Sequence, residues 1–389
     1  MSVAIETSLE PGAARLSPPS LRPMAFDDYA QVSTLLSANH FTRHPFSEWQ
    51  GIWTDNPLWR RLGKDFPIGW VLETHDSEIV GVLGSLATRY SLRGEDLVAA
   101  SGLTWFVSVP YRGFALWLID EYFGQPADVF INTTVSPDAH PTFEQLSSRI
   151  PMGDWETITY WLTSPRAAAE KALRKWKVPA VRPLVGSLAA ALRWKDAHRY
   201  RRLAPLAGPY SIQSAERFDS SFDVFWRELL RQKSTTLMAH RDSQTLSWHF
   251  AIPLRQGRIW IFTAVRHGRI RAYCLLTQQD HVFRLRDGDT MTFRGMRIAD
   301  YQSIETERDL LPGLLKAALG RCVAEKIDFL ENLGKGVPKM HAFDEHAPYR
   351  AKLDNWKFYY RAASVALENE LSQAQCWDPS PFDGDASME

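Results

Sequence analysis

The sequence lacks the marks of several common classes of protein. Its 45 basic and 45 acidic residues cancel, so no overall positive charge argues for nucleic acid as a partner. Its three cysteines, Cys274, Cys322 and Cys376, have no C-x-x-C spacing, which argues against a disulfide framework and a structural zinc site. No stretch approaches the roughly 20 apolar residues that a membrane-spanning helix needs. These absences predict a cytoplasmic protein with no DNA partner and no transmembrane segment.

Familiar catalytic motifs are missing as well. The chain has neither a G-x-S-x-G nucleophile elbow nor a G-x-x-x-x-G-K-[ST] phosphate loop, and its eleven histidines are scattered. No His or Cys cluster has the spacing of metal ligands. Asp287-Gly288-Asp289 resembles a calcium loop only superficially, and a hairpin turn explains it. The sequence therefore predicts no bound metal ion.

Length and hydrophobic content, in contrast, are ample for a folded protein. The 389 residues suffice for two domains, and 45% of them are hydrophobic. Fifteen are tryptophan, a residue that lines cores and the walls of ligand clefts. Residues 1–20 are the exception, because they contain three prolines and no apolar run of signal-peptide length. We expect a flexible tail there.

The first half of the chain has a clear order of strands and helices. Residues 21–24 predict a short strand, and an apolar stripe predicts a helix after it. Three apolar runs separated by turn residues then predict an antiparallel meander with strands at 68–73, 79–90 and 97–109. A helix and a parallel strand at 128–134 complete a right-handed β-α-β unit.

The centre of this half is the stretch Leu103–Leu118, in which a strand passes through a basic turn into a helix. Arg112 and Gly113 lie at the junction, where unpaired backbone N–H groups and the positive end of the helix dipole converge. Such a junction is a natural seat for a phosphate group. The apolar positions of the helix recur at the spacing of a face packed on a sheet. They are Phe114, Trp117, Leu118 and Tyr122.

This strand, its Val107-Ser108-Val109-Pro110-Tyr111-Arg112-Gly113 turn and the following helix resemble the acyl-CoA-binding core of the GNAT acyltransferase superfamily. In that family the backbone amides of the turn hold the pyrophosphate of coenzyme A. The resemblance implies acetyl-CoA or another acyl-CoA as a substrate. It places the residues that bind this cofactor at Val107, Val109, Arg112, Gly113, Phe114, Ala115 and Leu116.

The chain departs from the family's pattern in this loop and at the general acid. Its loop usually reads R/Q-x-x-G-x-G/A, whereas this chain has Ala115 and the bulky Trp117 at the small positions. The family's general acid is usually a tyrosine, which protonates the departing thiolate. The matching residue here is Phe143, which has no proton to give. Both departures favour the alternative of a non-catalytic GNAT-like module that binds a metabolite or a partner protein.

The second half repeats this organisation without repeating its residues. From Tyr210 onward the pattern is helix, helix, meander, strand, helix, strand. This order indicates an α/β (α+β) protein of two tandem GNAT-like domains, each a mixed, mainly antiparallel sheet flanked by helices. It is similar to the organisation of FemAB-type transferases. The R-D-x-x-x-L-x-W-x-F segment Arg241–Phe250 also resembles a feature of GNAT-like proteins encoded with bacterial polysaccharide synthesis.

Changes of pattern along the chain set the predicted boundaries. The segments are a flexible tail at 1–20, an N-terminal domain at 21–165, a basic helical connector at 166–207, a C-terminal domain at 208–362 and a C-terminal tail at 363–389. Basic residues far outnumber acidic ones in the connector. It is either a solvated linker or, through residues 171–202, a peripheral contact with anionic lipid or a phosphate-bearing substrate.

The function indicated is transfer of an acyl group from a thioester to a small-molecule amine, for instance an amino sugar, in a cleft between the domains. Aminolysis requires alignment of the reactants, removal of one proton and a backbone N–H for the oxyanion. The backbone near Val107 offers that N–H, and His249, Asp300 and Glu331 are the candidate bases. Two alternatives stay open: the non-catalytic module and an aminoacyl-tRNA-dependent transferase of the FemAB kind. The sequence leaves the oligomeric state open.

Overall fold

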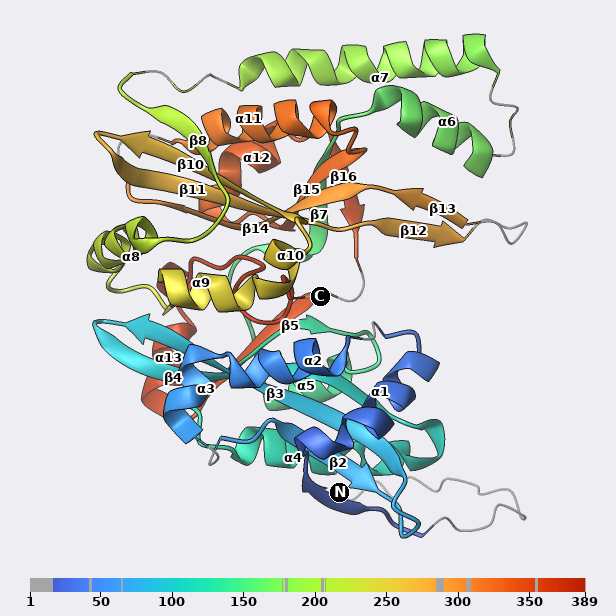
Figure 1. The fold of residues 1–389 in the computed structure, drawn as a ribbon, viewed down its shortest axis with the longest axis vertical. Helices are drawn as coiled ribbons and strands as arrows, with labels where there is room; N and C mark the ends of the chain where they lie inside the picture. The colour runs from blue at the N-terminus through green and yellow to red at the C-terminus, as the bar shows by residue number, and fades with distance from the viewer. Residues whose placement is uncertain are drawn as a thin grey trace, which may run out of the picture. The chain divides into compact units, whose positions relative to one another are not determined.

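The computed structural model describes most of the chain in two compact units (Figure 1). The described residues are 17–41, 44–63, 66–176, 178, 181–203, 206, 208–284, 290–305, 309–353 and 356–388. Residues 1–16 of the predicted tail and the Asp287-Gly288-Asp289 turn lie outside them. Unit 1 comprises Met1–Phe46, Pro67–Ser85 and Leu103–Gln125. Unit 2 comprises Ser47–Phe66, Leu86–Gly102 and Pro126–Glu389.

Unit 1 contains the strand, turn and helix singled out in the sequence. Its elements are β1 (Ser20–Pro23), η1 (Phe26–Asp28), α1 (Tyr29–Ala38), β2 (Gly69–Glu73), the first part of β3 (Ile79–Leu92), the last part of β4 (Glu95–Val107), η3 (Val109–Phe114) and α4 (Ala115–Gly124). β1 pairs antiparallel with β2, and β2 with β3. Gly69 has a φ of 143°, and a Cβ there would lie 2.3 Å from the Leu83 carbonyl oxygen. Only glycine allows so close an approach.

Unit 2 holds the remaining elements. Its helices are α2 (Phe46–Thr54), α3 (Pro57–Leu62), α5 (His140–Leu146), α6 (Pro165–Lys175), α7 (Arg182–Arg202), α8 (Ser220–Gln232), α9 (Ser243–His249), α10 (Ala251–Arg255), α11 (Leu311–Ala324), η4 (Pro338–Met340), α12 (His341–His346), α13 (Val365–Leu371) and η5 (Ala374–Cys376). Its strands, besides parts of β3 and β4, are β5 (Val129–Val135), β6 (Ser148–Arg149), β7 (Asp154–Leu162), β8 (Ser211–Ala215), β9 (Met238–Ala239), β10 (Ile259–Arg266), β11 (Arg269–Gln278), β12 (His281–Arg284), β13 (Thr290–Phe293), β14 (Gly295–Ser303), β15 (Phe329–Lys335), β16 (Tyr349–Lys352) and β17 (Lys357–Ala362).

Most strands belong to two large sheets. The hydrogen-bonded order is β1-β2-β3-β4-β5-β17-β6 in the first sheet and β8-β10-β11-β14-β15-β7-β16 in the second. β4 and β5 are parallel, as are β14 and β15. In the second sheet, β14 pairs antiparallel with β11, and β15 pairs antiparallel with β7. In the first sheet, β17 pairs antiparallel with both β5 and β6. The predicted class, α/β with mixed, mainly antiparallel sheets flanked by helices, is confirmed.

Each sheet contains strands from the other half of the chain, including β9, which pairs antiparallel with β3 in the first sheet. β7 precedes the connector in sequence but pairs antiparallel with β15 in the second sheet. β17 lies near the end of the chain and pairs antiparallel with β5 in the first sheet. The ranges 21–165 and 208–362 therefore do not coincide with the sheets, and as domains they stay a prediction. A ladder of hydrogen bonds depends on which strand edges meet and not on sequence distance, so local patterns could not reveal this exchange.

The apolar stripes predicted on two helices form part of the core of unit 2. On α8, Phe222, Phe225, Trp226 and Leu229 are buried. On α11, Leu311, Leu314, Leu315, Ala318, Leu319 and Cys322 are buried, and Pro312 lies in the first turn, where it removes no helical hydrogen bond. These helices follow the sequence pattern because each presents a single continuous apolar face to the core.

The end of the chain is folded, which corrects the prediction of a tail at 363–389. Residues 365–371 form α13, and nearly all side chains from 376 to 387 are buried despite the polar composition of this segment. We call 378–388 the C-terminal segment. Its aspartates and serines find partners in unit 2, including Thr133, whose hydroxyl donates to Asp385 Oδ1 at 2.6 Å. Burial of polar groups becomes tolerable when they are hydrogen-bonded in this way.

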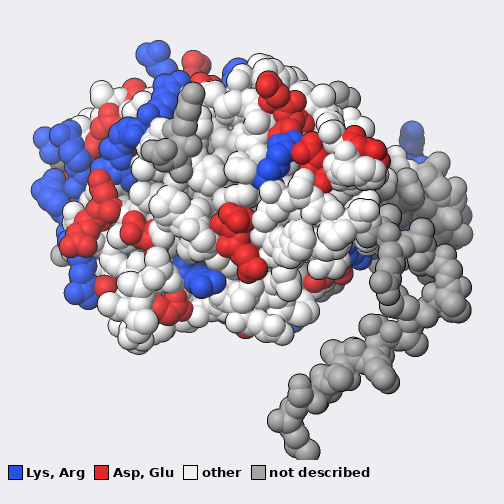
Figure 2. All heavy atoms as spheres, turned by 90° about the horizontal axis from the view of Figure 1, so that it is seen from below, with Lys and Arg blue, Asp and Glu red and all other residues white. Residues whose placement is uncertain are grey.

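The predicted connector consists largely of α6 and α7, which pack against each other through Ala169, Leu173, Val185 and Ala189. Among the helices described, none is both long enough and apolar enough to span a bilayer. The face of the molecule drawn in Figure 2 carries both basic and acidic side chains, and neither kind covers it continuously. This mixture agrees with the formal net charge of zero.

Candidate functional site

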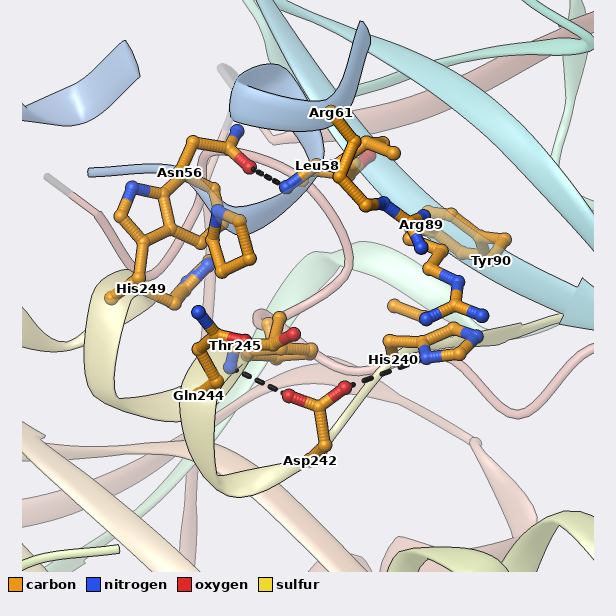
Figure 3. Close-up of a pocket in the computed structure, with 16 residues that line it drawn as sticks. Asn56, Leu58, Arg61, Arg89, Tyr90, His240, Asp242, Gln244, Thr245 and His249 are labelled. Atoms are coloured by element: carbon orange, nitrogen blue, oxygen red, sulfur yellow. Dashed lines mark hydrogen bonds and ion pairs between the residues drawn. The ribbon is translucent and has the colours of Figure 1, made fainter. Parts of the chain in front are cut away.

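Unit 2 contains a pocket of about 100 Å³ (Figure 3). Four segments line it: α3 with the residue before it, the Thr88–Tyr90 part of β3, the stretch from β9 through α9, and the C-terminal segment. Its wall combines the rings of Trp248 and Phe382 with polar side chains from each segment except the last. Apolar walls with a few convergent polar groups are typical of small-molecule sites.

The R-D-x-x-x-L-x-W-x-F segment forms one wall of this pocket, and its pattern has a structural explanation. Asp242 caps α9, because its Oδ1 accepts a hydrogen bond from the Thr245 N–H at 2.8 Å. Leu246 and Phe250 are buried in the core. The indole N–H of Trp248 donates to the carbonyl oxygen of Ile52 at 3.0 Å. These contacts fix the helix while its remaining side chains line the pocket.

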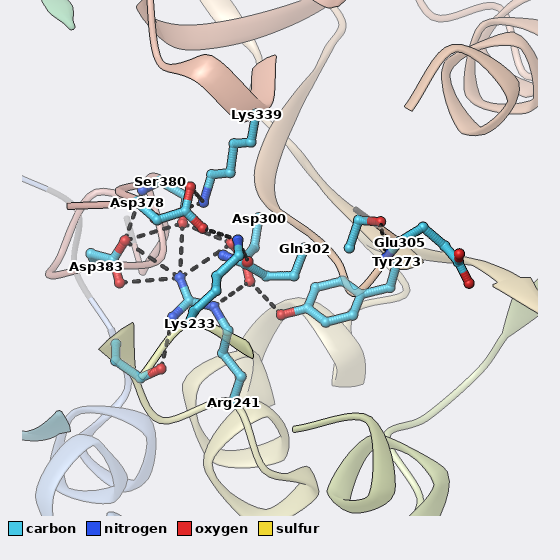
Figure 4. Close-up of polar contacts among 12 residues, drawn as sticks. Lys233, Arg241, Tyr273, Asp300, Gln302, Glu305, Lys339, Asp378, Ser380 and Asp383 are labelled. Atoms are coloured by element: carbon cyan, nitrogen blue, oxygen red, sulfur yellow. Dashed lines mark hydrogen bonds and ion pairs between the residues drawn. The ribbon is translucent and has the colours of Figure 1, made fainter. Parts of the chain in front are cut away.

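Arg241, the first residue of that segment, lies at the centre of a buried polar network (Figure 4). Its Nε donates to Asp300 Oδ2 at 2.8 Å and its second terminal nitrogen to Asp383 Oδ1 at 3.1 Å. The guanidinium also lies over the ring of Phe382, 4.7 Å from its centroid. Burial acts to lower the pKa of Arg241, but the two carboxylates outweigh it and raise the pKa well above its usual value.

Further charges and hydroxyls complete the network. Asp300 accepts hydrogen bonds from Tyr273 at 2.6 Å and Ser380 at 2.8 Å, and Asp378 forms ion pairs with Lys233 and Lys339. Burial raises the pKa of Asp300, but Arg241 and Lys339 prevail and hold it well below its usual range. The three cations thus face three aspartates, so that the charges balance in a region from which water is largely excluded.

The network holds the C-terminal segment against the pocket. Asp378, Ser380 and Asp383 belong to that segment, whereas Arg241 and Asp300 belong to the body of unit 2. Between them in sequence, Phe382 reaches the pocket wall, and its N–H donates to the Ala299 carbonyl oxygen at 3.0 Å. We conclude that the shape of the pocket depends on these buried charges.

Two of the three predicted bases are therefore engaged as ions. Asp300 is fully buried in its pair with Arg241. Glu331 is equally buried, and its Oε1 lies 2.7 Å from the Arg297 guanidinium. Burial raises the pKa of Glu331, but Arg297 and His281 lower it below its ordinary value overall. Neither residue lines the pocket. Carboxylates held in this way are weak proton acceptors.

His249 is the predicted base that does line the pocket. Its Nε2 lies 2.7 Å from the Ser387 hydroxyl of the C-terminal segment, and its ring lies 4.4 Å from that of Phe382. Burial lowers the pKa of His249 to about 3, so its imidazole is neutral near pH 7. A neutral imidazole offers one hydrogen-bond donor and one acceptor.

The structure also brings forward His240, which is not among the predicted bases. His240 lines the same pocket, with its ring nitrogens 3.3 Å from Asp96 Oδ1 and 3.6 Å from Asp242 Oδ2. Its ring lies 5.1 Å from that of Trp226. The signal in the sequence was its position directly before Arg241. Among the described residues no group of three His, Cys, Asp or Glu side chains could hold a metal ion.

The residues predicted to bind acyl-CoA lie together in unit 1. Val107 is buried at the end of β4, whereas Val109, Arg112, Gly113 and Leu116 are exposed along η3 and the start of α4. Phe114 and Ala115 are partly buried at the junction of the two helices. The turn therefore presents these positions to solvent, while the Ala115 N–H is already engaged with the Arg112 carbonyl oxygen.

The predicted apolar face of α4 needs a correction at Trp117. The buried residues are Leu118, Ile119 and Tyr122, whereas the Trp117 side chain is 40% exposed and meets Phe114 edge to face at 4.8 Å. The reason lies within α4 itself, where 3.6 residues per turn place successive side chains about 100° apart. Leu118, Ile119 and Tyr122 therefore share one face, and Trp117 lies outside it.

The similarities found for this chain are to solved structures. No protein-family model and no curated sequence matches it. N-myristoyltransferase of Saccharomyces cerevisiae with bound myristoyl-CoA is similar over 91% of this chain and 82% of its own, with a TM-score of 0.55 and 12% identity. A GCN5-related N-acetyltransferase of Anabaena variabilis is similar over 89% of this chain and 73% of its own, with a TM-score of 0.50 and 13% identity. An Enterococcus faecalis protein described as a probable N-acyltransferase is similar over 89% of this chain and 73% of its own, with a TM-score of 0.52 and 10% identity.

The chain has a GNAT-like fold. Identities of 10–13% over most of the chain support this statement about the fold and leave the reaction to be argued from the residues. The FemAB-type tandem organisation stays a prediction.

Within this GNAT-like fold, Phe143 is a buried residue of α5. Its ring lies 5.7 Å from that of Tyr359 on β17. The Tyr359 hydroxyl in turn donates to Glu144 Oε1 at 3.2 Å. Burial, together with Glu144, raises the pKa of Tyr359 to about 12. Phe143 thus has a packing role, and a tyrosine hydroxyl is supplied beside it by the exchanged strand.

Proposed function

We propose that this protein is an acyl-CoA-dependent N-acyltransferase, which moves an acyl group from a thioester to a small amine. The observation that carries the proposal is the similarity of nearly the whole chain to the folds of N-acyltransferases, one of them with bound myristoyl-CoA. In the reaction the amine nitrogen attacks the thioester carbonyl, a C–N bond forms, the C–S bond breaks, and the amine proton goes to the thiolate.

The acyl-CoA donor, acetyl-CoA or a longer acyl-CoA, is proposed to bind at the turn of unit 1. Residues Arg112–Leu116 support this assignment because Arg112, Gly113 and Leu116 are exposed and Arg112 adds a positive charge. The turn leads directly into α4, whose N-terminus favours anionic groups. The Val107 backbone at the end of β4 is proposed as the oxyanion donor.

The acceptor amine is proposed to bind in the pocket of unit 2. Of the three residues predicted as bases, His249 is the one that lines the pocket, and its pKa of about 3 makes it a weak proton acceptor as well. Its low pKa suits a neutral imidazole that accepts a hydrogen bond from the attacking amine and orients it. Asp300 and Glu331 are proposed to have structural roles and not to accept a proton, since both form ion pairs with arginines. An amino sugar remains one acceptor to be tested.

The proposal is tested by measuring the release of coenzyme A thiol from acetyl-CoA and myristoyl-CoA with a panel of amines, glucosamine included. Amine-dependent release, and a product with the acyl group on nitrogen by mass spectrometry, support the enzyme. His249→Gln keeps a hydrogen-bonding side chain and should lower kcat. Tight binding of coenzyme A without transfer to any amine would instead support the non-catalytic module, which the bulky Trp117 and the apolar Phe143 favour.

For residues 171–202 we propose a peripheral contact with an anionic membrane surface. Trp176 and Trp194 are 63% and 83% exposed, and Leu184 is also exposed. Basic residues predominate between them. Exposed indole rings beside basic side chains suit the boundary between lipid headgroups and acyl chains.

A further inference from the structure

One side of the pocket in unit 2 contains buried hydrogen-bond donors without acceptors. The Tyr90 hydroxyl and the Arg89 Nε have no hydrogen-bond partner among the described residues, and Tyr90 is 1% exposed. Burial raises the pKa of Tyr90 well above its usual value, so that its hydroxyl keeps its proton. An unpartnered buried polar group is costly, and its presence in a pocket points to a ligand that completes it.

His240 lies beside these two residues (Figure 3). Its ring nitrogens are within ion-pair distance of Asp96 and Asp242, yet both lack hydrogen-bond geometry to any described partner. An imidazole has at least one N–H to donate. Because the His240 nitrogens already face two carboxylates, the donors left for a ligand are the Tyr90 hydroxyl and Arg89 Nε, and a ligand rich in acceptors would satisfy them.

The charges around the pocket favour an anionic ligand as well. Arg89 is paired with Asp96, and Asp242 faces His240 and caps α9. Arg61 lines the pocket at its exposed side and forms no ion pair with a described residue. Arg61 thus places a positive charge at the opening with no carboxylate of the described residues paired to it. A guanidinium recognises carboxylate or phosphate oxygens with paired N–H donors.

We propose that the acceptor amine carries an oxyanion, a carboxylate or a phosphate, which binds to Tyr90, Arg89 and Arg61. This inference rests on the proposed function for the identity of the amine as acceptor. A pocket of about 100 Å³ admits a ligand of a few heavy atoms. With the oxyanion on the Tyr90 side, the amine of such a ligand faces His249 and Gln244 across the pocket.

The experiment compares three amines of similar size by ligand-observed NMR titration of the full chain. β-Alanine carries a carboxylate, O-phosphoethanolamine a phosphate, and propylamine no oxyanion. We expect one of the first two to bind at least about tenfold more tightly than propylamine, and the tighter one identifies the oxyanion. Tyr90→Phe and Arg61→Gln should each weaken that binding about tenfold. The matched control is Arg60→Gln, which removes an exposed arginine of α3 outside the pocket and should change nothing.

Tyr90→Phe keeps the ring and removes only an unpaired hydroxyl, so it should fold as well as wild type by thermal unfolding. Equal affinity for all three amines, no binding of any, or unchanged affinity in both variants overturns the inference. The proposed function is judged separately by acyl transfer. Binding that depends on Tyr90 but gives no transfer overturns the transferase and leaves the site. Equal acylation of propylamine and the two oxyanionic amines supports the transferase and overturns the oxyanion site.

Discussion

Arg241 and Asp300 form an ion pair in which neither side chain has any exposure to solvent, with Nε 2.8 Å from Oδ2. The two residues come from the stretch before α9 and from β14, 59 positions apart in sequence. Asp383, 142 positions from Arg241, joins them from the C-terminal segment. One arginine thus connects two distant parts of unit 2 behind the pocket wall.

Arg241→Met should strongly destabilise the protein. It leaves Asp300 and Asp383 buried without their main counter-charge, and breaking a buried pair in this way costs about 3–5 kcal/mol. Urea unfolding measures the loss. The control Arg60→Met breaks the exposed pair with Asp55, whose side chains are more than half exposed, and should cost under about 1 kcal/mol. A loss at Arg241 no larger than the control would show that the network is not structural.

His249 should make the stability depend on pH in the acid range. Its folded pKa is about 3, against 6.5 as the ordinary value, so the unfolded chain binds the extra proton between these pH values. The stabilising effect is full above pH 6.5 and falls as the pH drops toward 3, by about 1.4 kcal/mol per pH unit. Urea unfolding of wild type and His249→Gln at pH 7 and pH 5 tests this. An equally steep decline in the variant contradicts it.

Arg112→Glu should weaken coenzyme A binding by about ten- to a hundredfold, because it reverses a charge expected to face the pyrophosphate. Calorimetry of wild type and variant with coenzyme A measures the change. Arg269→Glu makes the same reversal at an exposed position of the β10–β11 hairpin and should have no effect. Unchanged affinity in a folded Arg112→Glu variant would place the cofactor elsewhere.

The pair of helices α6 and α7 should mediate binding of the protein to anionic vesicles. We expect co-sedimentation with vesicles containing phosphatidylserine and little with phosphatidylcholine alone, and a decrease with added salt. Replacing both Trp176 and Trp194 with serine should abolish most of the binding. Val323→Ser, at an exposed apolar position of α11, is the control. Equal binding to both kinds of vesicle would remove the electrostatic part of the proposal.

The sequence by itself determined the elements whose signals are local. The meander of the first half, the stripes of α8 and α11, and the passage from β4 through a basic turn to α4 were all readable from spacing. Each of these patterns arises from neighbours along the chain, since a helix or strand needs one continuous apolar face. The fold class followed from their order, and the similarity to N-acyltransferase folds confirms it.

Only the tertiary structure decided which strands exchange, why the C-terminal segment is buried and which predicted bases are held as ions. β7 and β17 carry no mark of the sheet that they join. The sequence around Asp300 does not indicate whether this residue is exposed or paired with Arg241. Asp383, the other partner of Arg241, belongs to a segment whose polar composition suggests a tail. The physical reason is that pairing of buried charges depends on groups far apart in sequence. Burial costs them their hydration, and only the folded chain supplies the partner that compensates for it.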